Sequence, residues 1–458
     1  MAQKVRTKSA EPSLVEKLEI ISNKDGRTVN ITGGLVELNY YESILNDTIR
    51  VEVTFVDSGF SIQGEGSERK TSVLEGLPLC GQERVNLKFK DNNNNSLGDK
   101  PKLTLYINKI TPQSENTRAS IVTLELVSRE YILNEKIRVN ERFDGKLSDH
   151  VRTILTGQSY LATEKNVEIE NTINNFNFFG NNKKPYYTIN WLSKKGVSAQ
   201  SQELKKSAGY FFYETSDGFF FKSIDGLLEQ KPKVSMIYNE TPDFRGNNIP
   251  EGYDFKVLDY SKDNLVNVND KLKIGAFSTR TVLFDPFTCF YQVLNPNAIE
   301  NEESLKLGGK NLFLGQTYRN KEFDIPGRNK EFSRTTYYLL DKGTIPTGNT
   351  QQQVEKSKTE NFEYSNILNQ SIMRYNQLFS AKYKITIAGN FSLHAGDAVF
   401  LDVPQLEEDK TKNVSKGNGG LYIITDICHR ITPAGTFTYC NLIRDSFGRK
   451  GNHTNRNQ

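Results

Sequence analysis

Histidine and cysteine, the most common zinc ligands, are scarce in this chain of 458 amino acids, which contains four of each. The densest group is Cys428, His429 and Cys440, whose side chains could ligate zinc. Adjacent residues of a strand point to opposite faces, so Cys428 and His429 are not expected to share an ion. We predict no metal site, and Cys428 and Cys440 could instead face each other across a hairpin as packed thiols. His150 is expected on a helix surface.

The motifs of the common enzyme classes are also absent. The chain contains no G-x-S-x-G, H-E-x-x-H, G-x-G-x-x-G or P-loop sequence. Glu407, Glu408 and Asp409 lie beside lysines, which is typical of a solvated loop. A cell-wall hydrolase needs an acid whose pKa is raised by burial, and no acidic residue stands out in an apolar helix or strand. We therefore predict a protein that is not an enzyme, with no catalytic residue and no cofactor.

Composition excludes two further classes. The 59 basic and 55 acidic residues give a net charge of +4, too balanced for a dedicated nucleic-acid binder. Hydrophobic residues make up 36% and charged residues 25%, as in soluble globular proteins. No run of about 18 apolar residues occurs, so no membrane span is expected. The N-terminal residues lack the apolar core of a secretory signal, and the scattered cysteines favour assembly in a reducing cytoplasm.

One stretch, residues 186–227, organises the elements around it. A short helix carrying Trp191, the only tryptophan, is expected after Pro185, with Gly196 as a left-handed residue at its end. A β-hairpin follows, with strands at 210–215 and 219–224. Asp217 and Gly218 form its expected turn, because glycine accepts positive φ and aspartate tolerates it.

This hairpin is apolar on both faces. The predicted pairing places Phe211, Tyr213, Phe220 and Ile224 on one face, and Tyr210, Phe212, Phe219 and Phe221 on the other. A hairpin at a surface is apolar on one face only, so both faces should be covered. A barrel interior on one side with a neighbouring domain or subunit on the other would do this, and so would a single large core. The candidate subunit or domain interface residues are Phe211, Tyr213, Phe219, Phe221 and Trp191.

Periodicity divides the remaining chain. Alternating apolar residues such as Val51, Val53 and Phe55 predict strands from about residue 15 to 130. Asp144 can cap a helix whose apolar stripe includes Leu147 and Val151. Another helix is expected over 365–379, followed by strands. The predicted organisation is a disordered arm (1–14), a first β-barrel domain (15–132), a small α+β domain (133–204), a second, discontinuous β-barrel (205–240 and 380–446), an inserted domain (241–379) and a tail (447–458).

Three segments carry a family resemblance. They are the Trp-Leu helix with YFFYE, DG and the following strand, then GNFSLHAGDAVFLDVP, then LYIITDICHRITPAGTFTYCNLIRDSFG. Together they resemble the central baseplate hub protein of contractile-tailed, T-even-like myoviruses, whose fold is related to the head of the type VI secretion spike protein VgrG. The resemblance covers much of residues 186–447 and touches 35–130 more weakly. It departs most at 240–360.

The resemblance implies a mainly β fold with some α: two antiparallel β-barrel domains, the second interrupted by an insertion, plus small α+β domains. It implies a homotrimeric hub in the virion tail baseplate, joining the six-fold tail tube to the three-fold spike. The implied partners are tail tube and tube-initiator proteins, a separate trimeric spike protein and baseplate wedge proteins. DNA would pass through the channel during genome ejection without sequence-specific binding. Two alternatives stay open, a baseplate-associated cell-wall hydrolase and a glycan- or receptor-binding tail protein.

Overall fold

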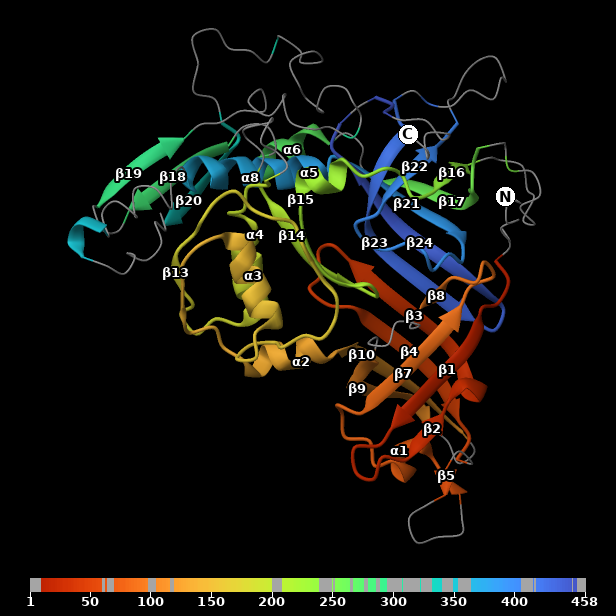
Figure 1. Ribbon diagram of the computed structural model, residues 1–458. Coiled ribbons are helices and arrows are strands. Elements are labelled where there is room, and N and C mark those ends of the chain that lie inside the picture. The colour runs from red at the N-terminus through yellow and green to blue at the C-terminus, as the bar shows by residue number, and fades with distance from the viewer. Residues whose placement is uncertain are drawn as a thin grey trace, which may run out of the picture.

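The computed structural model describes residues 10–59, 62–63, 70–97, 104–115, 119–199, 208–238, 249, 252–263, 267–275, 279–285, 289–294, 307, 322, 332–339, 349–352, 364–404, 415, 417–446 and 448–450. The elements form three main groups (Figure 1). Their buried apolar side chains make three clusters. The loop at Glu407–Asp409 and His453 lie outside the described residues.

The first group is a curved antiparallel sheet near the N-terminus. Its strand order is β2-β1-β7-β9-β10-β4-β3. The strands are β1 (Leu14–Ile21), β2 (Thr28–Asn30), β3 (Leu35–Ser43), β4 (Arg50–Asp57), β7 (Arg84–Lys90), β9 (Thr104–Glu115) and β10 (Ser120–Ser128), with β8 (Ser96–Leu97) on β7. The predicted alternation along β4 is confirmed, because Val51, Val53 and Phe55 are buried on the inner face.

Smaller elements close the far end of this sheet. They are η1 (Thr32–Gly34), α1 (Val73–Gly76), and the strand pair β5 (Ile62–Gln63) and β6 (Lys70–Thr71). The expected disordered arm differs in part from the structure. Ser13 donates its backbone N–H to Thr436 Oγ1 at 2.9 Å, and Thr436 donates its own to the Ala10 carbonyl at 3.2 Å. Residues 10–13 are therefore hydrogen-bonded to the distant strand β24.

The second group is a closed barrel built from residues far apart in the sequence. Its strands are β16 (Ser235–Tyr238), β17 (Phe255–Asp263), β21 (Ala381–Ala388), β22 (Ala398–Asp402), β23 (Gly420–Thr432) and β24 (Gly435–Arg444). Each strand pairs with the next in the order β23-β22-β16-β17-β21-β24, and β24 pairs again with β23. The expected mainly β fold is confirmed. The barrel is not wholly antiparallel, however, because β16 runs parallel to both of its neighbours.

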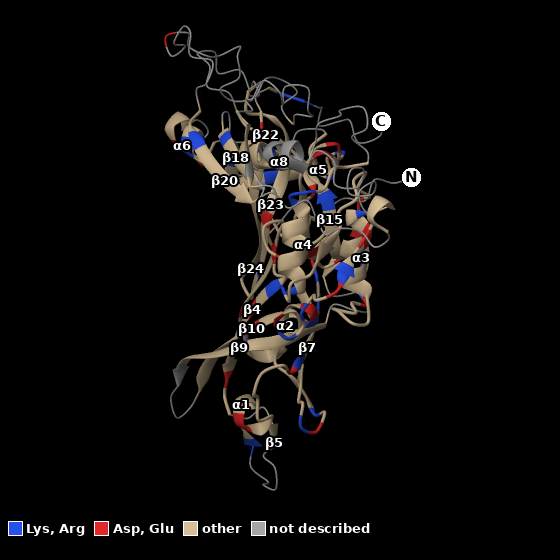
Figure 2. Cartoon of the chain, turned by 90° about the vertical axis from the view of Figure 1, so that its left-hand side faces the viewer, with Lys and Arg blue, Asp and Glu red and all other residues tan. Residues whose placement is uncertain are grey.

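The two β groups share one continuous sheet. Strand β3 of the first group pairs with β23 of the barrel, from Leu38 opposite Ile431 to Ser43 opposite Asp426. Figure 1 shows this junction between the red and blue strands. Main-chain hydrogen bonds thus fix the two groups relative to each other. In the part of the chain that the structure describes, basic and acidic residues are interspersed over both groups (Figure 2).

The third group packs helices against a short sheet. It contains α2 (Arg129–Lys136), α3 (Leu147–Thr156), α4 (Pro185–Ser193), α5 (Ile224–Leu228), β11 (Arg142–Phe143), β12 (Val167–Ile169), β13 (Phe178–Phe179), β14 (Tyr210–Thr215) and β15 (Gly218–Ser223). The predicted stripe of α3 is buried at Leu147 and Val151. The hairpin strands were expected in the second barrel, but they pair as β12-β15-β14 in a sheet of their own.

The last elements lie at one end of the molecule, beside the third group. A three-stranded sheet has the order β19-β18-β20, from β18 (Thr279–Asp285), β19 (Phe290–Leu294) and β20 (Arg334–Leu339). Two helices accompany it, α6 (Val268–Ile274) and α8 (Tyr364–Leu378). The predicted helix over 365–379 is confirmed as α8. Its buried Arg374 donates to Asp225 of α5 at 2.9 Å, which ties α8 to the hairpin group.

Three local expectations are corrected by the structure. His150 is buried, not on a helix surface, and its Nε2 lies 3.0 Å from the Phe176 carbonyl. Cys428 pairs with Tyr439 and Cys440 with Ile427, so the two thiols do not face each other. Gly196 is not among the residues with positive φ. A Cβ there would come within 2.7 Å of the Tyr210 ring, so the close approach of that ring requires glycine.

None of the helices among the described residues is both long enough and apolar enough to cross a membrane.

Candidate functional site at the tip of the β14–β15 hairpin

The β14–β15 hairpin lies between two of the three apolar clusters. Phe211 and Tyr213 belong to the cluster that fills the second barrel, together with Val399. Phe219 and Phe221 belong to the cluster beneath α3 and α4. Both faces are therefore covered within the chain, with the residues divided between the faces as their alternation predicts.

Stacked rings hold each face of the hairpin. Phe221 stacks on Tyr210 with ring centroids 4.6 Å apart, and Tyr213 stacks on Phe220 at 5.3 Å. Trp191, on α4, is half-buried and lies further from the hairpin. Its ring has the ammonium of Lys195 above it, 3.0 Å from the centroid. Among the candidate interface residues, Trp191 alone retains partial exposure.

The turn of the hairpin differs from the predicted one, but each side chain lies on its predicted face. Phe212 pairs with Phe221 and Thr215 with Gly218, so Ser216 and Asp217 form the loop. With Asp217 and Gly218 in the loop, Phe212 would have paired with Ser223. The pairing moves by two residues, and a shift by two leaves every side chain on its face. Gly218 has φ +129°, a conformation that favours glycine.

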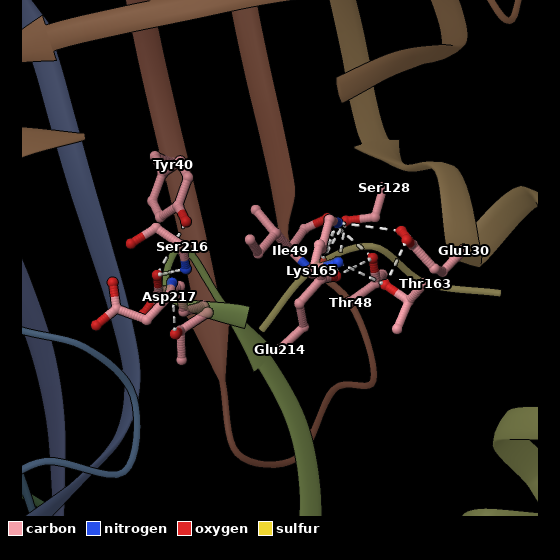
Figure 3. Close-up of polar contacts among 12 residues, drawn as sticks. Tyr40, Thr48, Ile49, Ser128, Glu130, Thr163, Lys165, Glu214, Ser216 and Asp217 are labelled. Atoms are coloured by element: carbon pink, nitrogen blue, oxygen red, sulfur yellow. Dashed lines mark hydrogen bonds and ion pairs between the residues drawn. The ribbon is translucent and has the colours of Figure 1, made fainter. Parts of the chain in front are cut away.

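A buried carboxylate, Glu214, joins the hairpin to the first sheet. Its oxygens accept from Ser128 Oγ at 2.7 and 2.8 Å, from Thr48 Oγ1 at 3.0 Å and from the Ile49 backbone N–H at 3.1 Å (Figure 3). Lys165 forms an ion pair with the same carboxylate. Ser128 is the last residue of β10 and Ile49 directly precedes β4. The Glu214 side chain therefore bonds to the adjacent ends of two neighbouring strands.

Lys165 also pairs with a second acid, which completes this network. Its ammonium lies 3.1 Å from Glu130 of α2, whose carboxylate also accepts from Thr163 Oγ1 at 2.7 Å. Burial alone would lower the pKa of Lys165, but Glu214 and Glu130 outweigh burial and raise it. Burial would likewise raise the pKa of Glu130, and Lys165 outweighs this and lowers it. The ammonium of Lys165 is thus compensated within the protein by two carboxylates.

A second buried carboxylate, Glu42 of β3, joins the hairpin to the barrel. It accepts from Tyr40 Oη at 2.9 Å, from the Ser216 backbone N–H at 2.8 Å and from the Ala395 backbone N–H at 3.1 Å. His394 places Nδ1 3.2 Å from both carboxylate oxygens. Figure 3 shows the Ser216 end of this network beside Tyr40. Glu42 thus connects the first sheet, the hairpin turn and the loop before β22.

Glu42 and His394 each shift the pKa of the other towards its charged form. Burial would lower the pKa of His394, but Glu42, with Asp217 and Asp397 further away, raises it. Burial would raise the pKa of Glu42, and the imidazole of His394 lowers it. For the neighbouring His429, burial outweighs the attraction of Glu42 and lowers the pKa to about 4. Glu42 thus favours the protonated form of His394, while His429 is neutral at pH 7.

A cavity of about 530 Å³ opens beside this joint, on the outer face of the shared sheet. It is lined by β3, the β3–β4 loop, the start of β4, Tyr131 of α2, β23 and β24. Four of its lining residues are acidic and one is basic: Glu42, Asp47, Glu52 and Asp426, with Arg50. Burial raises the pKa of Asp47 to about 6, and a hydrogen bond from Asn190 opposes this.

Sequence reasoning missed the polar members of this joint. It found no acidic residue in an apolar strand, yet Glu214 follows Tyr210–Tyr213 on β14 and is fully buried. That local context was the available signal. The partners of Glu42 and Glu214 come from other elements, and no local pattern marks them. The carboxylates of Glu42 and Glu214 accept hydrogen bonds from other elements of the chain and pair with His394 and Lys165. This arrangement holds the elements together.

Comparisons with known proteins extend this description. No protein-family model and no curated protein sequence matches the chain. Among solved structures, a tail protein from Neisseria meningitidis MC58 matches with a TM-score of 0.51 and 7% identity, covering 94% of this chain and 96% of that one. The 43 kDa tail protein of prophage MuSo2 from Shewanella oneidensis gives 0.49 and 10%, covering 94% and 98%.

A component of the type VI secretion system of E. coli also matches, with a TM-score of 0.40, 9% identity and coverage of 96% of this chain and 81% of that one. At such identities the similarity concerns the fold alone. Of these three matches, the Neisseria protein alone has a TM-score above 0.5. The chain shares, over nearly its whole length, the fold of the Neisseria tail protein, and the resemblance to tail hub proteins read from the sequence is confirmed at the level of the fold.

Proposed function

We propose that this chain is a structural component of a phage tail, acting as the trimeric central hub of a baseplate. The observation that carries the proposal is the fold shared with the Neisseria tail protein across 94% of this chain. The continuous sheet adds physical support. Two β groups in one chain, joined through β3 and β23, give six β units when three chains form a ring.

In this role the hub joins a six-fold tail tube to a three-fold spike. Each chain contacts two further copies of itself in the homotrimer. Its other partners are tail tube and tube-initiator proteins, a trimeric spike protein and baseplate wedge proteins. DNA passes through the channel without sequence-specific binding, which agrees with the net charge of +4 and the interspersed charges. The protein resides in the virion after assembly in the host cytoplasm.

A non-enzymatic role is part of the proposal. A hydrolytic acid needs a proton to donate and access to substrate. The buried carboxylates Glu42 and Glu214 are instead occupied by donors of the chain itself. A zymogram on peptidoglycan should show no clearing by the purified chain.

The decisive experiment locates the chain in the particle. Tail particles carrying a small fusion at the C-terminus of the chain are imaged by electron microscopy and averaged. The expected result is extra density on the tail axis, between tube and spike, with three-fold symmetry. Density away from the axis, or at the tips of peripheral fibres, would exclude the hub and favour the receptor-binding alternative.

A further inference from the structure

The exposed apolar side chains of the described residues are concentrated in one small part of the molecule. Of eighteen exposed large hydrophobic residues, nine fall in α6, the β18–β20 sheet and the residues immediately beside them. Exposed apolar side chains scattered singly are ordinary, whereas a contiguous group marks an interaction surface. The group is therefore a candidate contact site.

The strand register shows that most of these side chains share a face. Val282 is opposite Val293 of β19 and beside Tyr337 of β20, and Phe284 is opposite Tyr291 and beside Leu339. Tyr337 is 77% exposed, Leu339 69% and Tyr291 64%. The opposite face carries the buried Thr281 and Leu283 and packs towards α8. One face of this sheet is thus covered by the chain, and the other is apolar and open.

The open face has a basic border. The described segments 267–275, 279–285, 289–294 and 332–339 contain four basic and two acidic residues: Lys271, Lys273, Arg280 and Arg334, with Asp270 and Asp285. Arg280 lies on the open face itself, its guanidinium 5.2 Å from the Phe332 ring centroid. Surfaces of this kind fit a partner that combines apolar contacts with negative charge.

The same chain carries a surface of that complementary kind. Besides Glu42, whose carboxylate is buried and paired with His394, the 530 Å³ cavity on the outer face of the shared sheet is lined by three acidic residues and one basic residue: Asp47, Glu52 and Asp426, with Arg50. Leu45 and Tyr439, on its rim, are exposed at 56% and 37%. The cavity and the open face belong to different groups of elements and are distinct surfaces. A ring requires such a pair, because each subunit must present one surface to the next and a different one to the previous.

We infer that the open face of the β19-β18-β20 sheet docks onto the cavity beside Leu45 and Tyr439 of a second copy of this chain. Tyr337 and Leu339 supply the apolar contact, and Arg280 with the exposed Lys273 of α6 faces the acidic lining. The inference rests on the proposed trimer and names the surfaces that close it.

Cross-linking between two different variants tests the contact directly. In a background of Cys80→Ser, Cys289→Ser and Cys428→Ser, one preparation carries Leu339→Cys and a second, with a size tag, carries Leu45→Cys. Both positions are exposed, so neither substitution should disturb folding. The preparations are mixed, oxidised over a concentration series and separated by non-reducing electrophoresis.

The expected product is a tagged–untagged pair that forms only in the mixture. A product from Leu339→Cys alone would mean that two open faces meet each other, and this would overturn the inference. Absence of the mixed product at every concentration would also overturn it, and would favour a different tail protein as the occupant of the open face.

Light scattering supplies a second readout that needs no cysteine. Tyr337→Asp should weaken self-association by at least about tenfold, because an aromatic side chain at the centre of an interface is replaced by a charge. Tyr187→Asp is the matched control, since Tyr187 is 56% exposed on α4, outside both surfaces. Equal association of the two variants would contradict the inference.

The outcome is separable from that of the proposed function. If imaging places the chain on the tail axis and the cross-link fails, the hub stands and only the assignment of surfaces falls. If the cross-link forms and the chain lies off the axis, the contact stands and the hub falls.

Discussion

His394 and Glu42 meet within the protein although 352 positions separate them in the sequence, with Nδ1 of His394 3.2 Å from both carboxylate oxygens of Glu42. The pair lies where the first sheet, the hairpin turn and the barrel come together. Glu42 raises the pKa of His394 above its ordinary value and so favours the protonated imidazole. Its protonation therefore couples the stability of the joint to pH.

The first prediction is a loss of stability at alkaline pH that depends on His394. The pKa of His394 is raised in the folded protein above its ordinary value of about 6.5. The stabilisation is therefore complete below about pH 6.5 and is lost as the pH rises through the folded pKa. Urea unfolding between pH 6 and 9 should show a falling free energy of unfolding for the wild type and a flatter profile for His394→Gln.

The buried His429 titrates outside this pH window. Burial lowers the pKa of His429 to about 4, so its effect appears as the pH falls from about 6.5 towards 4. His429→Gln should change the acid side of the profile and leave the slope above pH 7 as in the wild type. Parallel profiles for wild type and His394→Gln above pH 7 would show that the Glu42 pair is not coupled to folding.

The second prediction concerns the buried network of Glu214. Glu214→Gln removes the charge that compensates Lys165 and places an amide NH2 among donors. Breaking a buried ion pair in this way costs about 3–5 kcal/mol. Glu168→Gln is the control, because Glu168 also pairs with a lysine, Lys222 at 2.9 Å, but is 54% exposed. The control should cost at most about 1 kcal/mol, and equal costs in chemical denaturation would refute the role of the network.

The third prediction concerns the aromatic faces of the hairpin. Phe219 and Phe221 are fully buried beneath α3 and α4, so replacing either with Ser should cost about 3–5 kcal/mol through the lost contacts and the cavity left behind. Phe179→Ser should change stability by about 0.5 kcal/mol or less, because Phe179 is 48% exposed. Thermal unfolding of the three variants compares them. An unchanged Tm for Phe221→Ser would contradict the packing.

The fourth prediction distinguishes two explanations for the glycine at position 196, the end of a helix and the close approach of the Tyr210 ring. Gly196→Ala should destabilise the protein by about 1–3 kcal/mol, because the added Cβ would come within 2.7 Å of the Tyr210 ring. Gly33→Ala is the control, since a Cβ at that position meets no atom within 4 Å. The double variant with Tyr210→Ala removes the ring that the added Cβ would meet. If Gly196 were needed only to end the helix, Gly196→Ala would cost the same free energy of unfolding in the Tyr210→Ala background as in the wild type. Relief of the cost in that double variant would establish the close approach.

The sequence by itself determined the elements whose patterns are local. The alternation along β4, the stripe of α3 and the two aromatic faces of the hairpin were all readable, because burial on one face imposes a period of two or 3.6 residues. The division of the hairpin residues between faces survived even a wrong turn assignment, since the pairing moved by two residues and not one. The mainly β class followed from these patterns.

Tertiary structure decided which elements meet. Nothing local tells β15 to pair with β12 and not with a barrel strand, or β3 to join β23. The partners of Glu42 and Glu214 come from elements far apart in the chain, so only the assembled fold shows that these carboxylates are buried and paired. Gly196 was read as a helix end, whereas its necessity comes from the ring of Tyr210 on a later strand. Long-range pairing and side-chain approach depend on the simultaneous packing of all three groups, which no short stretch of sequence encodes.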